Sequence, residues 1–243
     1  MIGLGSSIAK PGKIGKRIVR DGLVLKHDYN AGAVEPCSTG AVFVDGTNDY
    51  INTGSTFQST FRDSFSICTW VKPVDGQESE VTVLGTLSAN AEDGVRVDIL
   101  TGGEVRFVFE GNNDESYRST SSAVFSDGVN DWTHIACVAT KGGSGDTTLA
   151  LYINGVAMAT TLTAATTVAN HALYTSAINL TLGCRLYNTT PGRFFDGYMC
   201  NTGIWGAALT QDQVKSIMHK DYASLSASEK TNLVSWWNLS SDA

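Results

Sequence analysis

Segments in which apolar residues recur at every second position follow one another along most of the chain. Clear examples are residues 80–88 (EVTVLGTLS), 94–102 (GVRVDILTG) and 104–111 (EVRFVFEG). A period of two places successive side chains on opposite faces of a β-strand. Since glycine-containing turn signals separate these segments, the pattern predicts a meander of short antiparallel strands.

Two further segments predict a hairpin. Residues 132–140 (WTHIACVAT) and 148–156 (TLALYINGV) flank the glycine-rich sequence GGSGD at 142–146, which is expected to form the hairpin tip. The dipeptide Asn154-Gly155 is a type I′ turn signal, because that turn needs a positive φ at both of its central residues. The second strand is therefore expected to turn back on itself at its end.

The composition is that of a folded protein. Apolar residues make up 42% and charged residues 17% of the 243 residues, so the chain can bury a sizeable core. This length suits one β-sandwich of the larger kind. No run approaches the ~20 apolar residues of a membrane helix, so no membrane partner is expected. The N-terminus has no apolar stretch long enough for a signal peptide, so we expect no classical secretion.

Two capping boxes predict two short helices near the C-terminus. Thr210 with Gln213 precedes an apolar stripe, and Ser226 with Glu229 precedes a single turn. The pattern of residues 233–239 (LVSWWNL) then predicts a final strand.

The stretch between the hairpin and these helices predicts further strands. Residues 178–185 (INLTLGCR) are expected to form one strand. Residues 193–205 (RFFDGYMCNTGIW) are expected to make a turn at Asp196-Gly197 and then a long strand. Residues 157–178 are rich in alanine and threonine and are expected to hold a strand and a loop.

The N-terminal segment differs in charge from the rest of the chain. Residues 1–30 carry six lysines and arginines and only two aspartates, although the whole chain has a net charge of −7. We interpret residues 1–21 as an extended basic arm and residues 22–243 as the folded domain, with a first strand at 22–30. The arm lacks interleaved aromatic residues, which argues against nucleic acid and favours assembly on an acidic neighbour.

Five segments in their order along the chain resemble the laminin-G-like family of concanavalin-A-type jelly rolls. The resemblance implies an all-β fold, a two-sheet antiparallel jelly-roll sandwich, over residues 22–239. It also implies a lectin-like, glycan-binding or adhesive module. The segments are residues 44–51 (VDGTNDYI), 65–73 (FSICTWVKP), 132–140 (WTHIACVAT), 151–156 (LYINGV) and 194–214 (FFDGYMCNTGIWGAALTQDQV).

Residues 16–25 (KRIVRDGLVL), followed by such a body, resemble structural proteins of tailed bacteriophages. This resemblance implies a non-enzymatic virion protein that decorates a capsid or tail and presents the jelly roll outward. It would be located in the virion, bind other virion proteins through residues 1–40 and form a homo-oligomer through edge strands or the arm. The alternative is a lectin-like module that binds cell-surface glycans, and a third hypothesis is a glycosidase relative without its carboxylates.

The family resemblance also raises calcium as a candidate cofactor. Asp45, Asp49 and Asp196 are the candidate ligands, since Ca²⁺ needs six to eight oxygen atoms around it. The chain departs from the family pattern at Cys200-Asn201, where a pair of acids is common and a thiol is a poor ligand. The alternative is that both Asp-Gly pairs are turns whose aspartates bond nearby backbone. We therefore assign no metal site and expect no cofactor.

Catalysis is not expected. Jelly-roll glycosidases use paired carboxylates on one strand, whereas no predicted strand of this chain carries alternating acids, and its two clusters of neighbouring acids lie in polar stretches that we interpret as loops. The four histidines are scattered, and we expect His134 to be a packed or hydrogen-bonded core residue. No catalytic residue is assigned. The acids considered are Glu78, Glu80, Asp114 and Glu115, and the other histidines are His27, His171 and His219.

Exposed aromatic side chains could serve as stacking platforms for a glycan. Four aromatic residues fall near expected loops, and four tryptophans fall in strand patterns and are expected to lie in the core or on a sheet face. The candidates near loops are Tyr117, Trp132, Tyr174 and Tyr187, and the tryptophans in strands are Trp70, Trp205, Trp236 and Trp237.

The five cysteines are an odd number and show no CxxC spacing, so we interpret them as reduced thiols and assign no zinc site. Cys68 and Cys137 fall in strand patterns, where cysteine acts as a small hydrophobe. The other three are Cys37, Cys184 and Cys200.

Overall fold

The computed structural model describes residues 35–38, 40–75, 79–86, 94–111, 114–164, 169–187 and 189–240, with the backbone alone at 114, 115, 162–164 and 187. They belong to one unit, residues 33–243. The predicted arm at 1–21 and the predicted strand at 22–30 lie outside the described residues.

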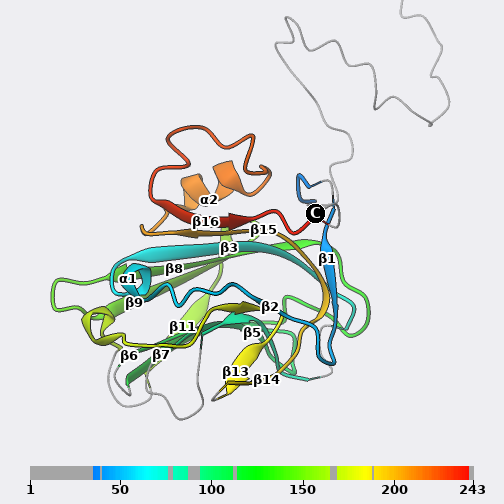
Figure 1. Cartoon of the computed structure of the whole chain (residues 1–243), viewed down its shortest axis with the longest axis horizontal. Coiled ribbons are helices and arrows are strands. Elements are labelled where there is room, and N and C mark those ends of the chain that lie inside the picture. Colours follow the sequence, from blue (N-terminus) through cyan, green and yellow to red (C-terminus); the bar gives the residue numbers. More distant parts are fainter. Residues whose placement is uncertain are drawn as a thin grey trace, which may run out of the picture. The chain divides into compact units, whose positions relative to one another are not determined.

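Two antiparallel sheets stack face to face, which confirms the predicted sandwich (Figure 1). Sheet A contains β1 (Val42–Asp45), β3 (Phe65–Pro73), β8 (Thr133–Lys141), β9 (Thr147–Ile153), β10 (Val156–Ala157), β15 (Asp196–Trp205) and β16 (Leu233–Trp237). Its strand order is β1-β15-β3-β8-β9-β10, and β16 pairs with β15 as well.

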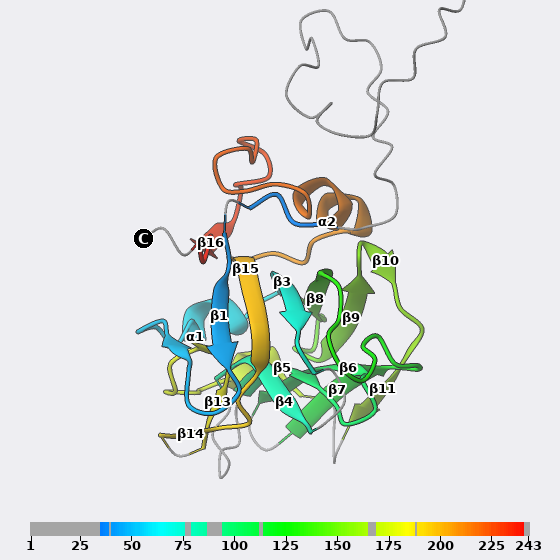
Figure 2. The same ribbon diagram turned by 90° about the vertical axis from the view of Figure 1, so that its right-hand side faces the viewer.

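Sheet B forms the second layer. It contains β2 (Ile51–Asn52), β4 (Val81–Gly85), β5 (Gly94–Ile99), β6 (Val105–Gly111), β7 (Asp114–Thr120), β11 (Thr160–Ala164) and β12 (Thr181–Leu182), in the order β11-β7-β6-β5-β4-β12-β2. The meander predicted from residues 80–111 is β4, β5 and β6. A separate hairpin of β13 (Arg185–Tyr187) and β14 (Thr190–Gly192) lies beside it (Figure 2).

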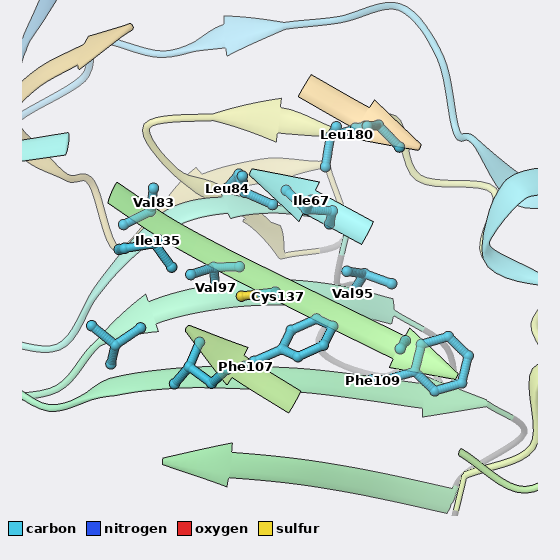
Figure 3. Close-up of a cluster of buried hydrophobic side chains, with 14 of the residues drawn as sticks. Ile67, Val83, Leu84, Val95, Val97, Phe107, Phe109, Ile135, Cys137 and Leu180 are labelled. Carbon is cyan, nitrogen blue, oxygen red and sulfur yellow. The ribbon is translucent and has the colours of Figure 1, made fainter. Parts of the chain in front are cut away.

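The core lies between the sheets and follows directly from the period of two. In β5, Val95, Val97 and Ile99 face inward, and Arg96 and Asp98, which alternate with them, face outward. Sheet A contributes inward side chains from β3 and β8 to the same cluster (Figure 3). Two short helical turns that the sequence did not predict, α1 (Gln58–Phe61) and η1 (His171–Leu173), also contribute Phe61 and His171 to the buried interior.

One of the two predicted C-terminal helices is confirmed. Helix α2 (Gln211–Ile217) begins at the Thr210 capping box and packs its Val214 and Ile217 on the outer face of sheet A, above Trp205 (Figure 1). The second box at Ser226 forms its reciprocal hydrogen bonds to the Glu229 side chain and backbone. The turn ends at Asn232, which has φ +61°. Residues 226–232 therefore form a hydrogen-bonded turn and no helix.

Two predictions between residues 178 and 205 are wrong in detail. The single strand predicted at 178–185 is divided between β12 and β13, because Gly183 adopts φ +85° and breaks the extended run. Asp196-Gly197 makes no turn and instead begins β15. Gly197 has φ +151°, and a Cβ there would lie 2.5 Å from the backbone oxygen of Lys72, so only glycine fits this close strand approach.

Strands β1 and β16 lie end to end along the same side of β15. Strand β1 pairs with its first part and β16 with its last part, with an irregularity between them at Cys200-Asn201. Asn201 has φ +45°, and its backbone N–H donates to the oxygen of Asn238 at 3.1 Å. Its side-chain amide donates to the oxygen of Cys37 at 2.9 Å. The two ends of the described domain therefore meet at one residue.

Candidate functional site

The four aromatic residues proposed from the sequence as exposed differ in how far their side chains are buried. Tyr174 is buried, and its hydroxyl lies 2.9 Å from that of Thr86, so it belongs to the core and the prediction is wrong. Tyr117 is half-buried in β7. The side chain of Tyr187 lies outside the described residues. Trp132 is half-buried just before β8, and it is the candidate that the fold brings next to other surface aromatic rings.

Trp132 belongs to a row of aromatic side chains across the outer face of sheet A. Phe43 of β1 and Tyr198 of β15 are directly paired in the sheet, and their ring centroids are 4.9 Å apart. The ring centroid of Trp132 lies 6.5 Å from the ring centroid of Tyr198, so Tyr198 contacts both other rings. Phe43 is 46% exposed and Tyr198 is 38% exposed. We call Phe43, Tyr198 and Trp132 the aromatic row.

A pocket of about 390 Å³ adjoins the aromatic row. Lys72 is paired with Tyr198 in the sheet, and both Lys72 and Trp132 line this pocket. The other wall adds the carboxylate of Glu35 and the hydroxyl of Ser38, which accepts from the backbone N–H of Gly40, and its residues are Glu35, Pro36, Ser38, Gly40 and Ala41. The arrangement places flat apolar rings beside a cation and hydrogen-bonding groups. Such a surface can stack on an apolar ring face of a ligand and bind its hydroxyl groups.

The sequence analysis missed Phe43 and Tyr198. Both fall at outward positions of a strand whose neighbours face inward, such as Val44 and Met199. An aromatic residue between two buried positions is the signal that could have found them, because the period of two places it on the solvent face. For the four tryptophans the prediction holds: Trp70 and Trp205 are buried, whereas Trp236 and Trp237 are partly buried.

The three calcium candidates do not assemble into a ligand set. The Asp45 carboxylate accepts hydrogen bonds from the backbone N–H groups of Thr47 and Asn48, which lower its pKa, so Asp45-Gly46 is the turn that the alternative interpretation predicted. Asp196 lies opposite Asp45, and burial and the negative charges of Asp45 and Asp75 raise its pKa. Among the described residues, no group of three or more His, Cys, Asp or Glu side chains is placed to hold a metal ion.

Charged side chains form an ion-pair cluster on the outward positions of sheet B. The Asp98 carboxylate is buried and accepts from Arg96 at 2.9 Å and from Arg106 at 2.7 Å. Arg106 also bonds Glu80 at 2.6 Å, and Arg193 bonds Glu80 at 3.0 Å. Glu80, one of the acids weighed for catalysis, is therefore held between two arginines.

The other acids weighed for catalysis give a mixed outcome. Asp114 and Glu115 begin β7, so their assignment to a loop was wrong. A polar stretch at the end of a strand resembles a loop in composition. These residues are extended because β7 pairs with β6, and a local pattern does not show that pairing. Glu78 lies outside the described residues.

His134 is a buried residue on the outer side of sheet A, as predicted. Its ring centroid lies 5.3 Å from that of Trp70, and its backbone N–H donates to the Asn154 side chain. Burial, with a smaller contribution from the charge of His219, lowers the pKa of His134 to about 3. His171 is also buried, in contact with Phe109, and burial lowers its pKa. His27 lies outside the described residues.

The five cysteines are free thiols, and four of them are buried. Burial raises the pKa of Cys200 to about 12, so the thiol that replaces the family's acid is protonated at neutral pH. Burial also raises the pKa values of Cys68 and Cys137. These side chains pack as small hydrophobes, as the sequence pattern predicted.

A model of the concanavalin A-like lectin/glucanase superfamily matches residues 45–215 of the chain. The chain belongs to this superfamily. The matched range runs from the end of β1 into α2, so it includes all of sheet B and most of sheet A, without β16. A search of curated protein sequences finds no match for this superfamily member.

Solved structures of carbohydrate-binding domains are similar in fold. The carbohydrate-binding module CBM40 of the Ruminococcus gnavus sialidase, bound to α2,3-sialyllactose, has a TM-score of 0.58 at 15% identity and covers 74% of this chain and 97% of that one. A carbohydrate-binding protein candidate from Bacteroides ovatus has a TM-score of 0.50 at 17% identity, covering 84% and 49%. A leech trans-sialidase has a TM-score of 0.56 at 13% identity, covering 75% and 28%. At these identities the likeness concerns the fold.

Neither described helix of this superfamily member is long and apolar enough to cross a membrane.

Proposed function

We propose that this protein is a non-catalytic carbohydrate-binding module and that the aromatic row contacts the sugar. The observation that carries the proposal is the row itself: three aromatic side chains from three separate strands or strand ends gather on one solvent-facing surface. Exposed apolar side chains in contiguous groups mark interaction sites more often than isolated ones do.

The chemistry beside the row favours a sugar over a purely apolar ligand. A sugar ring presents C–H groups on its faces and hydroxyl groups on its rim, so it needs both an apolar platform and polar partners. Tyr198 and Phe43 offer the platform, and the charged side chains of Lys72 and Glu35 in the adjoining pocket offer the partners. The adjoining volume of about 390 Å³ lies within the range of small-molecule sites.

The family and the similar structures support the same proposal. The superfamily contains lectins by description, and the similar structure from Ruminococcus gnavus is a carbohydrate-binding module bound to a sialylated lactose. From the sequence alone, glycan binding is the alternative to a virion structural protein. None of the similar structures named above is a virion protein, and the arm at 1–21 lies outside the described residues. The virion protein therefore stays a prediction, compatible with glycan binding by the same sandwich.

A glycan-binding measurement on the full chain tests the proposal. We expect binding to a printed glycan array and, in titrations, to α2,3-sialyllactose or to lactose, the first probes that the similar structures suggest. Tyr198→Ala and Trp132→Ala should each weaken the affinity for the bound glycan at least about tenfold, because each removes one ring of the platform.

Tyr222→Ala is the matched control. Tyr222 is 48% exposed, similar to Phe43, but lines a different surface with Val234 and Trp236. This variant should bind the glycan as the unmodified protein does, and circular dichroism should show all three variants folded. Equal affinity of Tyr198→Ala, Trp132→Ala and Tyr222→Ala would show that the row is not the site, and no binding to any glycan would contradict the proposed function.

A further inference from the structure

A second pocket, which we call the α2 pocket, lies between α2 and the turn at residues 226–232, on the outer side of sheet A (Figure 1). Its volume is about 630 Å³, compared with about 390 Å³ for the pocket beside the aromatic row. Its lining residues all fall within residues 207–232, a stretch that the structure describes without a gap. The α2 pocket is therefore large enough to hold a small-molecule ligand.

The charged residues that line the α2 pocket are two acids and one lysine, so together they carry one net negative charge. The Glu229 carboxylate accepts from the Lys220 ammonium and from the Ser216 hydroxyl, each at 2.5 Å. Burial raises the pKa of Glu229, but the hydrogen bonds from Lys220, Ser216 and Ser226 outweigh burial and lower that pKa to about 2. Glu229 and Lys220 thus neutralise each other, and the remaining charge of the lining is that of Asp212.

Asp212 lies in the first turn of α2, and its side chain is exposed. The next lysine along the helix, Lys215, does not line the pocket, and its side chain lies against the turn between β9 and β10. A Cβ added at Gly155 of that turn would be only 2.8 Å from Cγ of Lys215. Neither Lys215 nor Lys220 forms an ion pair with Asp212, so its carboxylate can pair with a positively charged group of a ligand in the pocket.

The rest of the lining combines amide groups with a small aliphatic surface. The side-chain oxygen of Gln213 accepts from the backbone N–H of Thr210 at 2.8 Å, which leaves the NH₂ group of the Gln213 amide for a ligand. Asn232 adds a second side-chain amide. Such a lining suits a ring that has apolar faces and hydroxyl groups on its rim. The apolar residues of the lining are all aliphatic: Ala207, Ala208, Leu209 and Ile217.

We propose that the α2 pocket binds an amino sugar, whose ammonium group pairs with Asp212. A hydrogen bond between an ammonium and a carboxylate is charge-assisted and about twice as strong as a neutral one. The amides of Gln213 and Asn232 can bond the hydroxyl groups of the sugar, for which the aliphatic chain of a basic peptide residue has no counterpart. The net negative charge of the lining disfavours an acidic sugar.

This site is separate from the aromatic row. The α2 pocket begins at Ala207, just beyond the end of β15, whereas Tyr198 of the aromatic row lies near the start of that strand. The amino-sugar site therefore adds a second site to the proposed function and does not rest on the first, and the two can fail independently.

Nuclear magnetic resonance titrations of the full chain with glucosamine, N-acetylglucosamine, glucose and butylamine test the site. At about pH 6 an amino group with a pKa of ~8 is protonated, so glucosamine is a cation whereas the other two sugars are neutral. We expect saturable binding of glucosamine and at least about tenfold weaker binding of both neutral sugars. Butylamine has the ammonium without the ring and should also bind more weakly. Equal binding of glucosamine and any of these three probes overturns the proposal.

Four variants locate the site. Asp212→Asn keeps the size of the side chain and removes its charge, so it should weaken glucosamine binding at least about tenfold. Asp127→Asn is the matched control and should not change it, because Asp127 is also exposed but does not line the pocket. Ala208→Leu keeps Asp212 and fills part of the pocket, so it should also weaken binding. Tyr198→Ala, which removes a ring of the aromatic row, should leave glucosamine binding unchanged.

Thermal unfolding distinguishes a binding role of Asp212 from a structural one. A carboxylate in the first turn of a helix stabilises it modestly, so Asp212→Asn should unfold at a slightly lower temperature without ligand. Glucosamine should raise the unfolding temperature of the unmodified protein and that of Asp212→Asn much less. Normal glucosamine affinity of Asp212→Asn or Ala208→Leu, or loss of binding in Tyr198→Ala, would place the amino sugar elsewhere and overturn the proposal.

Discussion

Replacing Asp98 by alanine is expected to lower the free energy of unfolding by about 3 kcal/mol. The Asp98 carboxylate is buried and accepts hydrogen bonds from Thr82, Arg96 and Arg106. Its removal leaves two guanidinium groups close together without their shared acid, and uncompensated buried charge is what makes the loss of one partner costly. The loss should fall at the lower end of the usual range, because Arg106 keeps its bond to Glu80.

Urea denaturation of the Asp98→Ala variant measures this effect, and Asp63→Ala is the control. Asp63 is also paired with a cation, but its ion pair with Lys141 is longer, at 3.8 Å, and the Asp63 side chain is mostly exposed. Exposed pairs of this kind contribute at most about 1 kcal/mol. Equal stabilities of the two variants would show that the cluster on sheet B is solvated and structurally unimportant.

Acid is expected to destabilise the protein through His134. The folded-state pKa of about 3 lies below the ordinary value for histidine, about 6.5, which we take for the unfolded chain. Above pH 6.5 the imidazole is neutral in both states, so stability does not depend on its titration there. As the pH falls from about 6.5 toward 3, the unfolded chain takes up a proton that the folded protein excludes. By pH 4.5 this difference should cost about 3 kcal/mol.

His134→Phe tests this assignment because it keeps a flat ring against Trp70 and cannot bind a proton. The variant should lose less stability between pH 7.5 and 4.5 than the unmodified protein does. Another buried imidazole, that of His171, also has a pKa that burial lowers. The ring of His219 lies beside Trp70, and its charge contributes to the lowered pKa of His134. His171→Phe and His219→Gln should therefore be measured in parallel. If the pH dependence of unfolding is the same with and without the His134 imidazole, His134 is not the acid-sensitive group.

The sequence was sufficient to predict the strands whose pattern is local. The meander of β4, β5 and β6 and the hairpin of β8 and β9 follow from alternation and turn residues within short windows. The same dipeptide behaved differently at two sites: Asp45-Gly46 makes a turn, whereas Asp196-Gly197 begins a strand. The close approach of the Lys72 backbone to Gly197 decides the second case, and that contact joins residues far apart in the chain.

The candidate site was less predictable for the same reason. Trp132 could be proposed as exposed from its position before a strand, but its neighbours Phe43 and Tyr198 come from strands at opposite ends of the domain sequence. Their adjacency requires the pairing of β1 with β15, which no local pattern encodes.

Because the two ends of the domain meet at Asn201, the domain is suited to circular permutation. The order of the strands along the chain would change, and their order in space would stay the same. A short linker from residue 238 to residue 37 would join β16 to β1 across a contact that already exists. New ends could then be opened at the hairpin tip, where residues 142–144 are exposed. For the same reason, the domain can be carried inside a surface loop of another protein, since both connections to its host would leave from one point.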